Sequence, residues 1–166
     1  MRTKRKKRVK LENKAKIRRR LLRLWKELVR LNWHNQCAVC GRKDKEPLEN
    51  GKLAILNCHH IESERNRTTR YDPANGILLC PSHHKFGKES FHRSAVWSMA
   101  WMKKNHPWLL SLVERHREEE AWDFNDREVL GRIENFLKRR IRGRKLSPRE
   151  SPKGQGKTPP GPDKEA

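Results

Sequence analysis

Two pairs of potential metal ligands constrain the fold more than any other feature of the sequence. Cys37 and Cys40 are separated by two residues, and so are Cys80 and His83. A two-residue gap lets both side chains of a pair converge on one ion, and zinc binds four such ligands in a tetrahedron. Gly41 follows Cys40 and relieves the backbone where it would curl around the metal. We therefore expect one structural zinc joining two segments that are 39 residues apart.

The remaining cysteine, Cys58, lies within a predicted strand, where Cys behaves as a small hydrophobic residue. We expect it in the core and not among the metal ligands. An even number of cysteines also suits disulfides in a secreted protein, and buried or unpaired thiols are a further alternative. The C-x-x-C pair and an N-terminus without the apolar segment of a signal peptide favour metal binding.

Positive charge is concentrated in two flanks of the chain, whose formal net charge is +21. Residues 1–33 carry 15 Lys and Arg against 2 acidic residues, and residues 127–146 carry 8 against 2, whereas residues 34–126 are almost neutral. Clustered Lys and Arg suit a polyanion, because each one placed on a phosphate releases condensed counterions. We expect a nucleic-acid partner; a solvated basic face is the alternative. No apolar stretch is long enough for a membrane, so the expected location is cytoplasmic.

Hydrophobic spacing predicts helices on both sides of a small central region. Residues 1–10 are almost all basic and residues 147–166 are rich in Pro, Gly, Ser and Lys, so both are expected to be disordered tails. Residues 11–33 form a basic amphipathic helix that either docks on the chain's own core or contacts a second copy in a homodimer. Its apolar stripe consists of Ile17, Leu21, Leu24, Leu28 and Leu31.

The region 34–95 alternates loops with short apolar segments. We expect a knuckle loop, a strand over 53–61, a polar Arg-rich loop over 62–74, a buried strand over 76–79 and a helix starting at Ser82 after Pro81. The region 96–146 is a helical extension with two helices broken near residue 106 and a last helix capped by Asn125 or Asp126. This order of elements predicts an α+β fold. The apolar side of the last helix should carry Val129, Leu130, Ile133, Phe136, Leu137 and Ile141.

Histidines and one asparagine lie between and just after the ligand pairs: His59, His60, Asn75 and His84. Hydrolysis of a phosphodiester needs a base for water, a divalent cation for the developing charge and a scaffold that fixes both. Histidine is a natural base near neutral pH and also a metal ligand. Adjacent residues of a strand point to opposite faces, so His59 and His60 can serve one site only where the strand ends or twists.

Residues 37–92, about a third of the chain, resemble the HNH endonucleases, the ββα-metal nuclease family. The resemblance rests on residues 37–41 (CAVCG), 58–61 (CHHI), 72–80 (DPANGILLC) and 80–84 (CPSHH). The sequence around residues 71–77 and 91–94 is most similar to HNH nucleases encoded by bacteriophages, including the branched-DNA recombination type. The resemblance implies a small ββα-metal core with zinc knuckles.

The resemblance also implies roles for single residues. His60 takes the position of the general base, and His59 and His84 take positions that bind the catalytic cation, Mg²⁺ or another divalent ion. Asn75 takes the position of an asparagine that either binds the metal or orients the loop of the base. His83 stands where a fourth Cys is usual, so His83 and His84 could exchange roles, and His92 is either a distal contact or a surface residue. Phosphate contacts are expected at Arg65, Arg67, Arg70 and Lys85.

The sequence therefore predicts a metal-dependent DNA endonuclease with structural Zn²⁺ and a separate divalent ion, located in the host cytoplasm if it is encoded by a phage. One alternative is a zinc-containing module that binds nucleic acid without catalysis. Another is a nuclease subunit of a phage recombination or packaging complex.

Overall fold

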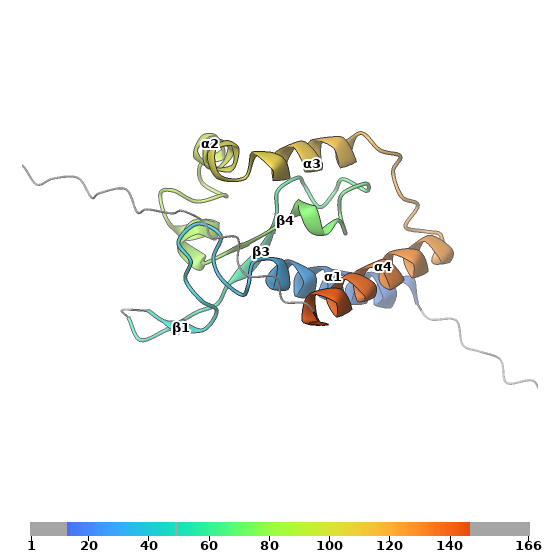
Figure 1. Cartoon of the computed structure of the whole chain (residues 1–166), viewed down its shortest axis with the longest axis horizontal. Coiled ribbons are helices and arrows are strands. Elements are labelled where there is room, and N and C mark those ends of the chain that lie inside the picture. The colour runs from blue at the N-terminus through green and yellow to red at the C-terminus, as the bar shows by residue number, and fades with distance from the viewer. Residues whose placement is uncertain (1–12, 49, 147–166) are drawn as a thin grey trace, which may run out of the picture.

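A computed structural model describes residues 13–48 and 50–146, and the predicted tails 1–10 and 147–166 lie outside this range. A central hairpin lies between two helical layers, with α1 and α4 on one side and α2 and α3 on the other (Figure 1). This combination of helices and two small sheets confirms the predicted α+β class. Among the described residues, no helix has the length and apolar character that crossing a membrane requires.

Helix α1 (Lys14–Asn32) is the central support of the core. Asn13 begins it, because its side chain accepts a hydrogen bond from the Ala15 amide at 2.8 Å. The helix lies along α4 (Arg127–Leu146), and Arg20 and Glu134 form an ion pair at 2.7 Å between them. The predicted apolar stripe therefore docks on the chain's own core. Its buried residues are Ile17, Leu21, Trp25, Leu28 and Val29, and Leu24 and Leu31 of the predicted stripe are half-buried and pack against the same core.

The central hairpin consists of β3 (Asn57–His60) and β4 (Gly76–Leu79), which pair antiparallel with His60 opposite Gly76. All four residues of β4 are buried, as predicted for this apolar segment. Because β3 ends at His60, the chain is free to turn away directly after the His59–His60 pair. The hairpin therefore presents this pair at its open end.

The strand predicted over residues 53–61 is divided into two strands of different sheets. β2 (Leu53–Ala54) pairs with β1 (Glu46–Pro47), whereas β3 pairs with β4. Between them, the Leu56 amide donates to Asp44 at 2.9 Å and the Leu56 carbonyl accepts from Arg30 at 2.7 Å. Side chains thus satisfy the backbone groups that a continuous ladder would have used.

The C-terminal helices follow the predicted order. The structure has α2 (Ala95–Asn105) and α3 (Pro107–Arg117), and Pro107 occupies the first turn of α3. Asp126 accepts a hydrogen bond from the Glu128 amide at 2.7 Å at the start of α4, as predicted for a cap. Phe136, which was expected on the apolar side of this helix, is 42% exposed and lines a surface pocket.

Close approach between α1 and β4 requires a glycine at position 76. A Cβ atom added to Gly76 would lie 2.2 Å from Cγ2 of Val29 and 3.0 Å from Trp25. Gly76 is buried, and its carbonyl accepts from the Trp33 indole at 2.9 Å, so the strand has little freedom to move away. The hairpin can therefore sit directly on α1 only because this side chain is missing.

We predict that Gly76→Ala lowers the free energy of unfolding by about 1–3 kcal/mol, because the extra methyl overpacks the contact. Urea unfolding of purified variants measures the change. The matched control is Gly131→Ala in α4, where an added Cβ meets nothing within 4 Å and helix propensity favours alanine. Val29→Ala should partly rescue Gly76→Ala. Equal stability of wild type and Gly76→Ala would show that the contact is not tight.

Candidate active site and metal centres

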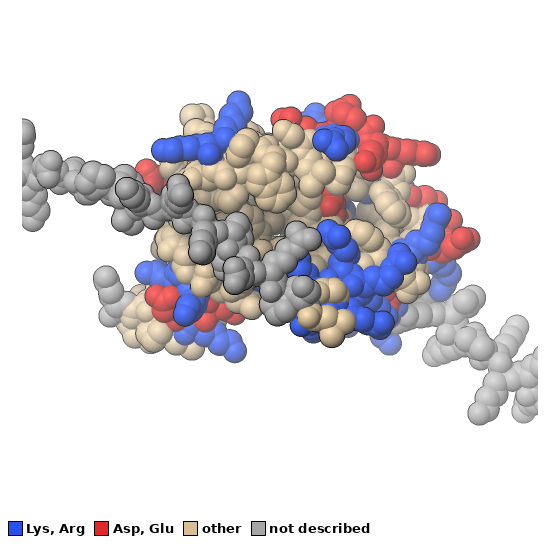
Figure 2. Space-filling model, in the orientation of Figure 1, with Lys and Arg blue, Asp and Glu red and all other residues tan. Residues whose placement is uncertain are grey.

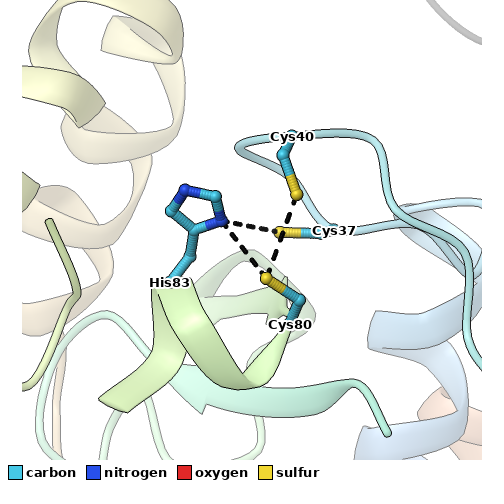
Figure 3. A group of neighbouring side chains, drawn as sticks. All are labelled: Cys37, Cys40, Cys80 and His83. Carbon is cyan, nitrogen blue, oxygen red and sulfur yellow. Dashed lines mark hydrogen bonds between the residues drawn. The ribbon is translucent and has the colours of Figure 1, made fainter. Parts of the chain in front are cut away.

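Four side chains from two segments converge in a cysteine–histidine cluster formed by Cys37, Cys40, Cys80 and His83 (Figure 3). Their ligand atoms all lie within 4.8 Å of one another. Nδ1 of His83 is 3.2 Å from Sγ of Cys80 and 3.7 Å from Sγ of Cys37, while Cys40 and Cys80 are 3.9 Å apart. The sequence pairs thus meet in space as expected, and the arrangement is compatible with a structural zinc ion.

The backbone around the cluster explains why the ligands converge. Gly41 has a φ of +71°, and its amide donates to the Cys37 carbonyl at 2.8 Å, which closes the first knuckle. The Ala38 amide donates to the Leu78 carbonyl at 2.8 Å, which attaches this knuckle to β4. The second pair begins directly after β4, so one strand end carries Cys80 and the following turn carries His83.

Proton affinities in the cluster are strongly perturbed by mutual hydrogen bonding. Hydrogen bonds from Cys40 and Cys80 lower the pKa of the Cys37 thiol. Hydrogen bonds to Cys37 and Cys80 raise the pKa of His83 to about 9. These groups therefore share protons in a compact space, and a bound cation would replace those protons as the common partner of the ligands.

A second group contains only histidines: His59, His84 and His92. Their ring nitrogens also lie within 4.8 Å of one another, and the Nε2 atoms of His84 and His92 are 3.2 Å apart. His59 comes from β3, His84 from the π-helical turn η2 (Ser82–Phe86) and His92 from the turn before α2. Three imidazoles that face each other in this way can bind one divalent ion.

The turn η2 separates the roles of two adjacent histidines. A helix beginning at Ser82 was predicted, but the structure forms a single wide turn that ends at Gly87, whose amide donates to the Ser82 carbonyl at 2.8 Å. Successive side chains of such a turn point in different directions. His83 therefore lies in the cysteine–histidine cluster, and His84 lies in the histidine group.

Burial favours the neutral forms of His59 and His84. Burial is the largest cause that lowers the pKa of His59 to about 4, and the nearby His92 and His84 rings lower it further. Burial also lowers the pKa of His84. At neutral pH both rings therefore keep a lone pair available for a metal ion.

His60 lies on the opposite face of β3 and belongs to neither group. Its ring stacks on the indole of Trp25, with centroids 3.9 Å apart and an interplanar angle of 4°. Nε2 of His60 is 3.0 Å from the Arg70 carbonyl, and because a carbonyl can only accept, this nitrogen carries the proton. Burial lowers the pKa of His60. A neutral His60 thus has its basic lone pair on Nδ1 and a ring fixed from two sides.

Asn75 holds the loop that follows His60. It is fully buried in η1 (Pro73–Asn75), where its amide group donates to the carbonyls of Glu62 and Thr69 at 3.0 and 3.2 Å. Its Oδ1 accepts from the Glu62 amide at 2.6 Å. Asn75 lies outside the histidine group, so its geometry matches loop orientation, one of the two roles considered for it.

The predicted phosphate-binding residues differ in their exposure and in their contacts within the chain. Arg65 and Lys85 are exposed. The guanidinium of Arg67 donates twice to the Trp122 carbonyl, at 3.0 and 2.7 Å, and so holds the linker before α4. Arg70 is half-buried, with its guanidinium 5.6 Å from the centre of the Tyr71 ring. Two of the four side chains are thus engaged within the chain.

Cys58 lies outside both groups, as expected from its place in a strand. Its Sγ approaches the Lys26 carbonyl at 3.5 Å, and burial raises its pKa to about 11. It therefore behaves as a half-buried thiol that faces α1.

Two contributors were missed by sequence reasoning. For His92, both a distal contact and a surface residue were considered, and it is exposed; what the sequence did not indicate is that the Phe91 and His92 amides donate to the His83 and His84 carbonyls at 2.9 and 3.2 Å and return the chain to the site. The stacking of Trp25 on His60 had no sequence signal, because the two residues are distant in the chain.

Comparison with known proteins agrees with this geometry. Residues 37–92 match a protein-family model described as HNH endonuclease. No curated protein and no solved structure matches the chain. The matched segment, about a third of the chain, contains both metal-ligand groups, His60 and Asn75, and over these residues the chain is similar to HNH endonucleases.

Proposed function

We propose that this protein is a DNA endonuclease that uses a divalent ion at His59, His84 and His92 and employs His60 as the general base. The observation that carries this proposal is the convergence of three imidazoles next to the strand end that bears His60. The family match supports nuclease activity in general, and the arrangement of these side chains supports the assignment of roles.

The residues of the site divide the work of hydrolysis. A bound divalent ion would supply positive charge for the scissile phosphate and for the leaving oxygen. His60 would accept the proton of the attacking water at Nδ1, because Nε2 is committed to the Arg70 carbonyl. Trp25 fixes the plane of the His60 ring, and Asn75 fixes the loop that supplies Arg70. The base is therefore oriented by its surroundings before substrate arrives.

The nature of the ligands bears on the choice of metal. Imidazole nitrogens suit first-row transition ions, whereas Mg²⁺ prefers oxygen ligands. The histidine group offers three nitrogens, so we propose a divalent ion that accepts nitrogen ligands in preference to Mg²⁺. For the cysteine–histidine cluster we propose structural Zn²⁺, because three thiol groups and one imidazole complete a closed tetrahedral set.

The basic surface of the helices supports DNA as the substrate. Figure 2 shows Lys and Arg side chains gathered over α4, which carries 8 basic residues against 2 acidic ones. Arg65 and Lys85 are exposed on the two segments that flank the histidine group, where they are free to contact phosphates. The apolar face of α1 is buried against the chain itself, so it offers little support for the homodimer considered above. The likeness to phage branched-DNA nucleases stays a prediction.

His60→Ala should reduce nicking of supercoiled plasmid by about 100- to 10,000-fold, the usual contribution of a general base. His59→Ala should abolish nicking with every divalent ion tested, because it removes a ligand of the proposed metal site. Nicking is measured by gel electrophoresis with Mn²⁺, Ni²⁺, Mg²⁺ or EDTA.

The matched control is His34→Asn, which changes a histidine outside both ligand groups and keeps a residue that tolerates its φ of 53°. This variant should cut like the wild type. If His60→Ala cuts equally well, the assigned base is wrong. If the wild type binds DNA but does not cut it with any of the divalent ions tested, the protein is a non-catalytic binding module.

Zinc content should distinguish the four cysteines. We predict that Cys40→Ser lowers bound zinc from one ion per chain toward zero and reduces thermal stability, because structural zinc contributes folding energy. Cys58→Ser is the control, since Cys58 lies outside both groups. Elemental analysis and thermal unfolding measure the two effects. Loss of zinc in Cys58→Ser but not in Cys40→Ser would contradict the assigned ligand set.

The acid limb of the pH profile should report the lowered pKa of His60. Because burial lowers this pKa below the ordinary value of 6.5, His60 stays unprotonated and active down to that pH and loses its base function only below it. Single-turnover cleavage is measured as a function of pH, with DNA binding measured in parallel. An acid midpoint above 6.5 with unchanged binding would contradict a buried, neutral base.

A further inference from the structure

A pocket with a volume of about 350 Å³ lies outside the proposed active site, between the loop after β3, the end of α3 and α4. One wall is formed by Tyr71 and Asp72 and another by Phe136 of α4. Trp122 and Phe124, from the linker between α3 and α4, complete its aromatic lining. Its size is at the lower end of the range typical of small-molecule sites.

The aromatic lining is more exposed than the core packing requires. Trp122 is 38% exposed and Phe136 is 42% exposed, although both are large apolar side chains. Tyr71 and Phe124 are buried behind them, with ring centroids 5.2 Å apart. Exposed rings around a hollow can stack on a flat ligand without disturbing the core.

Polar groups of the pocket indicate what kind of flat ligand fits. Arg132 and Arg139 line the α4 side of the pocket, whereas Glu119 lines the α3 side. Figure 2 shows the same contrast, with acidic side chains near the end of α3 and basic ones over α4.

The pocket is joined directly to the segment that orients His60. Tyr71 and Asp72 follow Arg70, whose carbonyl accepts from the His60 ring. The Asp72 carbonyl accepts from the Trp25 indole at 2.8 Å, and Trp25 stacks on His60. The Asp72 carboxylate accepts a short hydrogen bond from His116 of α3. A ligand in the pocket therefore contacts the residues next to those that hold the proposed base.

We propose that this pocket binds one unstacked nucleotide of a DNA strand, with its base against Trp122 and Phe136 and its phosphate toward Arg132 and Arg139. The proposal rests on the proposed function, because it takes DNA as the substrate. An aromatic surface accepts any base through its π face, and arginines bind the adjacent phosphate. A paired base inside a duplex cannot enter such a pocket without leaving its stack. The protein therefore prefers DNA that contains an unpaired nucleotide over fully paired DNA.

The test measures binding without cleavage. A duplex with one unpaired 2-aminopurine and the same duplex fully paired are titrated with the zinc-loaded full chain without any added divalent ion, and fluorescence reports stacking of the unpaired base. The wild type should change the 2-aminopurine fluorescence and bind the unpaired-base duplex more tightly. Trp122→Ala and Phe136→Ala should each weaken that binding by about 5-fold or more, the value of one stacking contact, and leave paired-duplex affinity unchanged.

Control variants separate the pocket from general effects. Trp108→Ala removes an aromatic residue that is 63% exposed on α3 but does not line the pocket, and it should bind like the wild type. Arg139→Ala should lower the preference for the unpaired nucleotide, whereas Arg142→Ala on the same helix should affect both duplexes equally.

Each outcome decides the proposal. Equal affinity of the wild type for both duplexes, or unchanged binding by Trp122→Ala and Phe136→Ala, would overturn it. If free deoxynucleotide fills the pocket at concentrations that do not change the preference for the unpaired-base duplex, the pocket is a site for a free nucleotide. That result would also overturn the proposal. Plasmid nicking by the wild type tests the nuclease proposal separately from these binding measurements, so a failure of the pocket proposal is distinguishable from a failure of the nuclease proposal.

Discussion

Convergence of three thiols and one imidazole joins the two halves of the nuclease segment, and the site depends on it. The first knuckle follows α1, and the second follows β4, so their meeting holds the hairpin against the helix. Because the knuckle amide of Ala38 also bonds to β4, this connection is reinforced by the backbone. A cation in this cluster would therefore stabilise the fold and fix the position of η2 at the same time.

The short turn η2 connects the cluster with the chemistry. His83 and His84 are adjacent on this turn, but His83 lies with the cysteines and His84 lies with the other histidines. The cysteine–histidine cluster and the histidine group are therefore joined by one turn. The return of the chain through Phe91 then brings in His92 by backbone hydrogen bonds to the same turn. The geometry of the histidine group is thus set by backbone contacts beneath it, which explains how three exposed or half-buried rings can be held close together.

Helix α1 packs on the core, contacts His60, the proposed general base, and carries basic residues. Its buried face packs on α4 and on the hairpin, and Trp25 extends this packing to the ring of His60. Trp25 also binds the Asp72 carbonyl, so the loop that orients the base is attached to the same helix. Since α1 and α4 also carry many Lys and Arg residues, the helices that support the proposed base also present positive charge of the kind that attracts a polyanion.

What the sequence determined by itself was local: the spacing of the ligand pairs, the buried strand β4 and the helices, because each depends on neighbours only a few residues away. Only the tertiary structure decided the assignment of His83 and His84, the inclusion of His92 and the exposure of Phe136. It also decided that Leu56 lies between two strands and pairs with neither, because the distant side chains of Arg30 and Asp44 bind its backbone. These features depend on contacts between segments far apart in the chain, whose distances local spacing does not specify.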